Sequence, residues 1–312
     1  MKPKVSINLC CYNSEKYLRE TLDSVVSQTH KDWELVIIND GSIDSTESII
    51  REYVEQGYPI IYHYQQNKGL SYSRNKALEL SGGEFIALID HDDLWLDNTL
   101  KKLVDGIESD DYALCYGGVQ FIDKHGKKIR DYTPKYSSGY IFDRLLKHID
   151  IYIPAVIIRK SVLDNYTLRF DENLKTSEDV SFFLELGINR KFCVLRSPIS
   201  QYRIHDESLT SASISRWAYE REYTLDLICS KYPEIRESYR GGFKQAYAKA
   251  NYYRARYYMF KGRKNEAINE MKKVLFTNHK YFVLFILLFF PDGFWNFAHK
   301  LRYHRSVFSE KF

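Results

Sequence analysis

Residues 5–90 alternate between short apolar segments and amphipathic segments, and this alternation restricts the fold more than any other feature of the chain. The apolar segments are typical of strands buried on both faces of a parallel sheet. The segments between them carry apolar side chains at helical spacing. The sequence therefore predicts an α/β fold with a mostly parallel sheet and right-handed crossovers. The expected strands are Val5–Cys10, Trp33–Ile38, Ile60–Tyr64 and Phe85–Ile89.

Composition and charge narrow the class of protein. The 312 residues are 44% hydrophobic and 28% charged, which is typical of a globular protein with one large domain or two moderate ones. A net charge of +4 fits anionic ligands or an anionic membrane surface, but it is too weak to indicate nucleic acid. The five cysteines show no metal-ligand spacing, so we expect reduced thiols in the cytoplasm. The N-terminus leads directly into a strand, so we expect no signal peptide.

Three carboxylates follow the fourth expected strand, at Asp90, Asp92 and Asp93. In an open α/β sheet, ligands bind at the carboxyl ends of the strands. Crowded carboxylates there are costly unless a cation neutralises them, and Mn²⁺ and Mg²⁺ prefer carboxylate oxygens. We therefore expect a divalent metal that carries a phosphate ligand. The alternative is a solvated turn that caps a helix beginning near Asp97.

Two phosphate-binding motifs are absent from the sequence. The first strand is followed by Cys11–Ser14 without a glycine, so the dinucleotide fingerprint is missing, and no P-loop motif occurs. A bound nucleotide would therefore be held by side chains and a metal.

Several short motifs occur together in an order that resembles glycosyltransferase family 2, the inverting nucleotide-sugar transferases of GT-A fold. The resemblance covers roughly residues 1–210, and it implies a GT-A sheet, an enzyme and a nucleotide-sugar donor. The motifs are Tyr12-Asn13, Asn39-Asp40-Gly41-Ser42 with Asp44 and Thr46, Arg74-Asn75 before Gly83-Glu84, Asp90-x-Asp92-Asp93, and Ser177-Glu178-Asp179.

The resemblance implies roles for the donor-binding residues. The Tyr12 ring would stack on the base, although it could instead close the core. Asp40 would accept hydrogen bonds from the base, and Arg74 would approach the base or the diphosphate unless it is only an exposed helical arginine. The full expected donor site is Tyr12, Asn13, Asp40, Arg74, Asp90, Arg203 and His205.

The resemblance also implies where the metal and the general base lie. Asp92 would ligate the cation, with His205 as a possible second ligand, and Asp90 would contact the ribose or a metal-bound water. Asp179 is the expected general base. The alternative for Asp179 and Glu178 is that both only favour a helix N-terminus, and the alternative for the loop after Tyr202 is an ordinary exposed loop. The roles of Asp93 and Glu178 stay open.

The C-terminal third is expected to be helical. We expect a catalytic domain at residues 1–215 and a helical region at 216–312. The apolar run Tyr281–Phe290 has about half of the roughly 20 residues that span a bilayer. With its aromatic and basic neighbours, it suits a membrane-associating tail at about 280–312. A buried terminal helix or an oligomer contact is the alternative.

We therefore expect a metal-dependent inverting glycosyltransferase that moves a sugar, with UDP as the expected carrier, to a hydroxyl of a glycan or lipid-linked glycan. Its expected place is surface polysaccharide synthesis, peripherally at the cytoplasmic face of the membrane. One alternative is a sugar nucleotidyltransferase, which would need a glycine-rich basic loop after the first strand. The other is a catalytically inactive sugar- or partner-binding module of the same fold.

Overall fold

The computed structural model describes residues 3–205, 214–291 and 293–295. The chain divides into two compact units. One comprises the residues up to Leu145 together with Ile149–His205, and the other comprises Leu146–His148 and the residues after 205. Residues 206–213 lie outside the described ranges, so the domain boundary expected at residue 215 stays a prediction.

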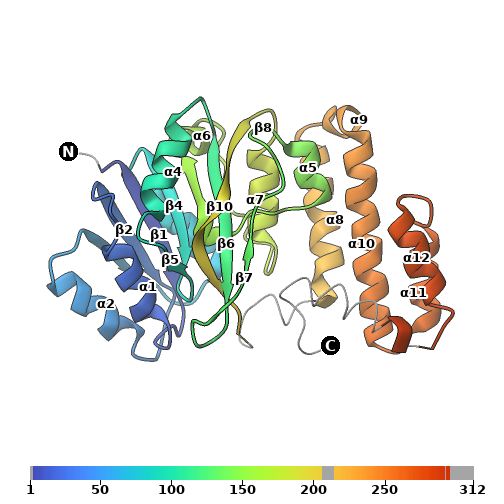
Figure 1. Ribbon diagram of the computed structural model, residues 1–312, viewed down its shortest axis with the longest axis horizontal. Coiled ribbons are helices and arrows are strands. Elements are labelled where there is room, and N and C mark those ends of the chain that lie inside the picture. The colour runs from blue at the N-terminus through green and yellow to red at the C-terminus, as the bar shows by residue number, and fades with distance from the viewer. Residues whose placement is uncertain (1–2, 206–213, 292, 296–312) are drawn as a thin grey trace. The chain divides into compact units, whose positions relative to one another are not determined.

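The first unit is built on one sheet, to which ten strands contribute within the described ranges (Figure 1). The first four strands pair in parallel in the order β3-β2-β1-β4. All four strands expected from the sequence form, so the predicted parallel α/β core is confirmed. Their bounds are β1 Val5–Cys11, β2 Trp33–Asn39, β3 Ile60–Tyr64 and β4 Phe85–Asp90.

The second half of the sheet is mixed. Strand β9 lies between β4 and β6 and pairs antiparallel with both. It therefore joins the parallel half of the sheet to the mixed half. Strand β10 runs parallel to β6, whereas β5, β7 and β8 pair antiparallel with their neighbours. The bounds are β5 Leu94–Trp95, β6 Leu114–Ile122, β7 Lys128–Tyr132, β8 Gly139–Tyr140, β9 Val156–Arg159 and β10 Lys191–Arg203.

Helices flank this sheet. Helix α3 packs on β1 and β2, where Ala77 lies against the buried side chains of Cys10, Val36 and Ile38. The segments are α1 Leu18–Val26, α2 Thr46–Glu55, α3 Leu70–Leu80, α4 Thr99–Glu108, α5 Phe142–Lys147, the 3-10 helix η1 Ile153–Ala155, α6 Lys160–Asn165 and α7 Glu178–Leu186.

The second unit is helical, as the sequence predicts. The Arg221 guanidinium ties its parts together, because it donates to the carbonyls of Ala246 and Leu146. The helices are α8 Ile214–Lys231, α9 Ile235–Ser238, α10 Arg240–Phe260, α11 Lys264–Lys272 and α12 His279–Leu287.

Helix α12 and the residues after it contain the apolar run noted in the sequence, and this run has two faces. Leu284 and Leu288 are buried in a core cluster with side chains of α10 and α11. The opposite side is exposed and carries Phe282, Val283, Ile286, Phe289 and Phe290. Among the described helices, none is both long and apolar enough to cross a membrane. Residues 296–312 of the expected membrane-associating tail lie outside the described ranges.

Candidate active site

The expected donor-binding residues gather at one edge of the sheet. Strands β1, β2 and β4 end together, because Cys11 pairs in register with Asn39 and Cys10 pairs with Asp90. The segments that follow these strand ends therefore emerge at the same edge, where ligands bind in open α/β sheets.

The loops after β1 and β2 are tied to each other by Asn13. Its backbone is in the left-handed region, with φ 49°. Its N–H donates to the Ser42 hydroxyl over 3.0 Å, and its side-chain oxygen accepts from the Ile43 N–H over 3.0 Å. Neighbouring Tyr12 is 50% exposed, so its ring is accessible to a ligand. Asn13 thus holds the loop from which Tyr12 projects.

Asp40 is almost fully buried, with 4% of its surface exposed. Its carboxylate accepts three hydrogen bonds, from the Gln65 side chain over 2.7 Å, from the Lys68 N–H over 2.9 Å and from the Gly69 N–H over 2.8 Å. Gly69 is the residue from which helix α3 starts. In this structure, Asp40 therefore fixes the entry to α3.

Arg74 on α3 links two of the sequence motifs. One guanidinium nitrogen lies 2.6 Å from Glu178 Oε1 and another lies 2.9 Å from Asp90 Oδ1. The guanidinium also lies over the Phe170 ring, 5.3 Å from its centroid. Arg74 is buried, so the alternative of an exposed helical arginine is excluded. It neutralises two carboxylates that would otherwise repel each other at the sheet edge.

The aspartate-rich turn is held from several sides. Asp92 Oδ2 lies 2.7 Å from His205 Nε2. Asp93 is buried, and its Oδ1 accepts from the Arg203 N–H over 2.8 Å. The Arg203 side chain is also buried and donates to the Asp92 carbonyl over 2.9 Å and to Glu20 Oε2 over 2.7 Å. The end of β10 is therefore anchored to this turn, and Arg203 and His205 do not lie in an ordinary exposed loop.

The acidic groups of the site have different pKa shifts. Burial raises the pKa of Asp179 to about 7, and the charge of Glu178 adds to the shift. Burial also raises the pKa of Asp93 well above its ordinary value, together with the charges of Asp92 and Asp90. Burial acts on Asp92 in the same direction, but the hydrogen bond from His205 and the nearby histidine charges outweigh it and lower the pKa. Of these groups, Asp179 is the one tuned to accept a proton near neutral pH.

Asp92 and His205 together fit a divalent cation whose coordination shell is completed by a bound substrate. No cluster of three or more His, Cys, Asp or Glu side chains suited to a metal occurs among the described residues. Magnesium and manganese sites commonly use one or two carboxylates together with substrate phosphates, and imidazole is acceptable to manganese. Two protein ligands are therefore sufficient if a diphosphate supplies others.

Some residues of this site carry no signal in the sequence. Glu20 on α1 pairs with Arg203, and the Tyr17 ring lies 4.6 Å from the Arg203 guanidinium and 5.2 Å from the His205 ring. Neither residue belongs to a recognisable motif. Their roles depend on contacts between segments that are far apart in the sequence.

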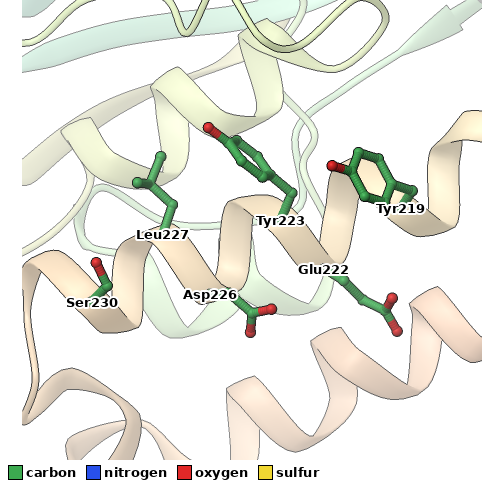
Figure 2. A pocket seen from close by; sticks show the side chains of 6 residues that line it. All are labelled: Tyr219, Glu222, Tyr223, Asp226, Leu227 and Ser230. Carbon is green, nitrogen blue, oxygen red and sulfur yellow. The ribbon is translucent and has the colours of Figure 1, made fainter.

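A separate depression of about 390 Å³ lies beside α8 in the helical unit (Figure 2). Two of its carboxylates are already paired, Glu222 with Arg254 and Asp226 with the Tyr247 hydroxyl. It contains none of the expected site residues. Its lining is Tyr219, Glu222, Tyr223, Asp226, Leu227 and Ser230.

The sheet and its flanking helices have the GT-A fold of solved glycosyltransferases. Solved structures share the fold. The S. aureus TarS 1–349 fragment in complex with UDP-GlcNAc superposes with a TM-score of 0.70 over 96% of this chain and 92% of that one, at 19% identity. The mannosyltransferase PcManGT of Pyrobaculum calidifontis, in complex with GDP-Man and Mn²⁺, gives a TM-score of 0.60 over 88% and 75%, at 14% identity.

The chain belongs to glycosyl transferase family 2, because the family model matches residues 6–167. An uncharacterized glycosyltransferase of Methanocaldococcus jannaschii is 32% identical over 72% of this chain and 79% of its own length. The minor teichoic acid biosynthesis protein GgaB of Bacillus subtilis is 28% identical over 68% of this chain, which spans 24% of GgaB. The protein is therefore a glycosyltransferase, and family membership decides against a sugar nucleotidyltransferase.

Proposed function

We propose that the protein transfers a sugar from a nucleoside diphosphate, UDP first among the candidates, to a hydroxyl of a glycan or lipid-linked glycan, with inversion at the anomeric carbon. The observation that carries this proposal is the division of labour at the sheet edge. Asp92 Oδ2 lies 2.7 Å from His205 Nε2. The pKa of Asp179 is raised to about 7, and Arg74 pairs with the neighbouring Glu178.

The proposed chemistry is a single displacement. The acceptor hydroxyl oxygen attacks the anomeric carbon while the bond from that carbon to the diphosphate oxygen breaks, and the bonding electrons leave with the nucleoside diphosphate. Asp179 takes the proton of the hydroxyl as the new bond forms. A divalent cation, held by Asp92 and His205, would supply charge that stabilises the departing diphosphate.

The remaining residues are proposed to bind or position the donor. Tyr12, which is half exposed, is free to stack on the base. Asp40 and Asn13 are proposed to shape the loops around the base, because their side chains already bond to those loops. Asp90 is proposed to face the ribose or a water on the metal. The Arg203 side chain is directed to Glu20 and the Asp92 carbonyl, which supports a role in holding the turn.

We also propose that the protein takes part in surface polysaccharide synthesis and that it works at the cytoplasmic face of a membrane. A relative in teichoic acid biosynthesis supports the pathway. The exposed apolar side of α12 and of the residues after it supports peripheral attachment, with Phe289 63% exposed. Phe289→Ser with Phe282→Ser should reduce co-sedimentation with anionic phospholipid vesicles. Tyr140→Ser, which changes an exposed tyrosine of β8, is the control, and unchanged co-sedimentation of the double variant would contradict attachment.

The transferase activity is tested with the full chain, Mn²⁺ and a panel of nucleotide sugars, by following release of the nucleoside diphosphate. We expect slow release from one UDP-sugar that stops when EDTA removes the metal. No turnover of any nucleotide sugar would favour an inactive binding module.

A further inference from the structure

A cluster of aromatic rings lies on the second half of the sheet. Phe121 of β6 is buried, and three partly exposed tyrosines surround it. They are Tyr132 of β7, Tyr152 before η1 and Tyr202 of β10, and we call these three residues the tyrosine cluster. The ring of Phe121 lies 5.5 Å from Tyr152, 5.7 Å from Tyr202 and 6.4 Å from Tyr132. Tyr152 in turn lies 5.4 Å from Tyr132 and 5.5 Å from Tyr202. Edge-to-face contacts of this kind fix the rings relative to one another.

The tyrosine cluster lies beside the catalytic carboxylates. Tyr202 directly precedes Arg203, whose N–H donates to Asp93. Tyr152 directly precedes Ile153, which lines a void of about 10 Å³ together with Asp90 and Arg74. The pKa of Tyr202 is raised by burial and then by the charges of the neighbouring aspartates, Asp179 included.

The Tyr132 hydroxyl differs from that of a neighbouring tyrosine. Tyr116 is buried and its hydroxyl donates to Asp150 over 3.1 Å, so its polar group is satisfied within the protein. The Tyr132 hydroxyl is also buried, but it has no hydrogen-bond partner among the residues that the structure describes. A buried polar atom without a partner costs free energy, which a ligand with hydroxyl groups can recover.

These features match the chemistry of a sugar ring better than that of an open-chain acceptor. A pyranose has an apolar C–H face that packs on aromatic rings and a rim of hydroxyls that exchange hydrogen bonds with phenols. An open-chain polyol phosphate has no such apolar face. The Arg130 guanidinium lies over the Phe121 ring, 4.6 Å from its centroid.

We propose that the tyrosine cluster is the acceptor subsite and that it binds a pyranose, so that the chain glycosylates a cyclic sugar rather than a polyol phosphate. This inference rests on the proposed transfer reaction and specifies its acceptor. It places the acceptor on β6, β7, β10 and the residue before η1. Donor binding is left to the loops after β1 and β2.

The test compares variants and acceptors under the same donor conditions. Tyr152→Leu should raise the acceptor KM by about fivefold to tenfold, with a smaller change in the donor KM. Tyr152→Phe keeps the ring, so it should change the acceptor KM less, and it still reports if the leucine variant fails to fold. Tyr132→Phe tests the unpaired hydroxyl and should also raise the acceptor KM. Tyr140→Leu, on β8, is the control and should behave as the wild type.

Acceptors are methyl pyranosides on one side and ribitol 5-phosphate and glycerol 3-phosphate on the other. Faster transfer to a pyranoside supports the inference. Preference for a polyol phosphate, an unchanged acceptor KM in Tyr152→Leu, or a larger change in the donor KM than in the acceptor KM overturns it. These outcomes all require turnover of a nucleotide sugar, whereas failure of the proposed function would appear as no turnover in the wild type.

Discussion

Two pairs of adjacent acidic residues, Asp92-Asp93 after β4 and Glu178-Asp179 at the start of α7, are organised in the same way. In each pair one carboxylate is buried and committed to the protein. Asp93 accepts from the Arg203 N–H, and Glu178 pairs with Arg74. The other carboxylate of each pair is less buried. These two less buried groups, Asp92 and Asp179, are the ones proposed for the metal and for the base.

The two uncommitted carboxylates differ in protonation. The hydrogen bond from His205, with the histidine charges, lowers the pKa of Asp92 against the effect of burial. Asp179 accepts a hydrogen bond from the Val180 N–H, but burial and the charge of Glu178 raise its pKa to about 7. The surroundings, and not the residue type, therefore lower the pKa of one aspartate and raise the pKa of the other.

The largest loss of activity is expected from removing the proposed base. Asp179→Asn should lower the transfer rate by about 10³-fold, within the range that general-base catalysis supplies. Donor affinity, measured by calorimetry with UDP and Mn²⁺, should stay near the wild-type value. Glu185→Gln, on the same helix, is the control. If Asp179→Asn kept its turnover, the base would have to be another group.

Asp92 should respond differently from Asp179. Asp92→Asn should lower transfer by about 10²-fold and shift the Mn²⁺ concentration needed for half-maximal activity upward, because a ligand charge is lost. The measurement is a metal titration of the initial rate. A variant that lost activity with an unchanged metal midpoint would remove Asp92 from the metal site.

Arg74 links the two pairs, so its loss should appear mainly in stability. Arg74→Met leaves Glu178 buried without its cation, and breaking a buried pair in this way typically costs about 3–5 kcal/mol. Urea unfolding measures this cost. Arg74→Lys keeps the charge and should lose less. A methionine variant as stable as the wild type would mean that the pair contributes little.

The parallel half of the fold was predictable because its signal is local. The apolar run Phe85–Ile89 and the acids that follow it are adjacent in sequence, and the strand and the turn formed as expected. The antiparallel insertion of β9 between β4 and β6 was not predictable, because nothing in the Val156–Arg159 segment indicates which strands it pairs with.

The residues proposed for the site lie at one edge of the sheet, but the pairs that they form were not predictable. Arg74 was expected to face the nucleotide, yet its nearest partners are Asp90 and a glutamate 104 residues away. Sequence alone cannot say which carboxylate meets which arginine, because the pairs join segments that are far apart in the sequence. For the same reason, the contacts of Tyr152 and Tyr202 with Phe121 became visible only in the fold.

The pH dependence of transfer should report the pKa of Asp179. As the proposed base, Asp179 would act only when deprotonated, so kcat/KM should rise about tenfold per pH unit below a pKa of about 7 and level off above it. The sign for stability is opposite. The folded chain holds this proton to a higher pH than the unfolded chain. The free energy of unfolding should therefore fall as the pH rises from about 4 to about 7. An acidic limb near pH 4 would mean that burial does not perturb the base.

The smallest effect is expected at Asp93, the committed member of its pair. Asp93→Asn keeps an oxygen that can accept from the Arg203 N–H, so both activity and stability should change little. Asp93→Ala removes that acceptor and leaves the N–H buried, which should cost about 1–3 kcal/mol in urea unfolding. Because Asp92→Asn is the same chemical change one residue away, the pair of asparagine variants separates the two roles directly. Equal losses of activity in both would mean that the two aspartates act together at the metal, and the division between a committed and an uncommitted carboxylate would not hold at this turn.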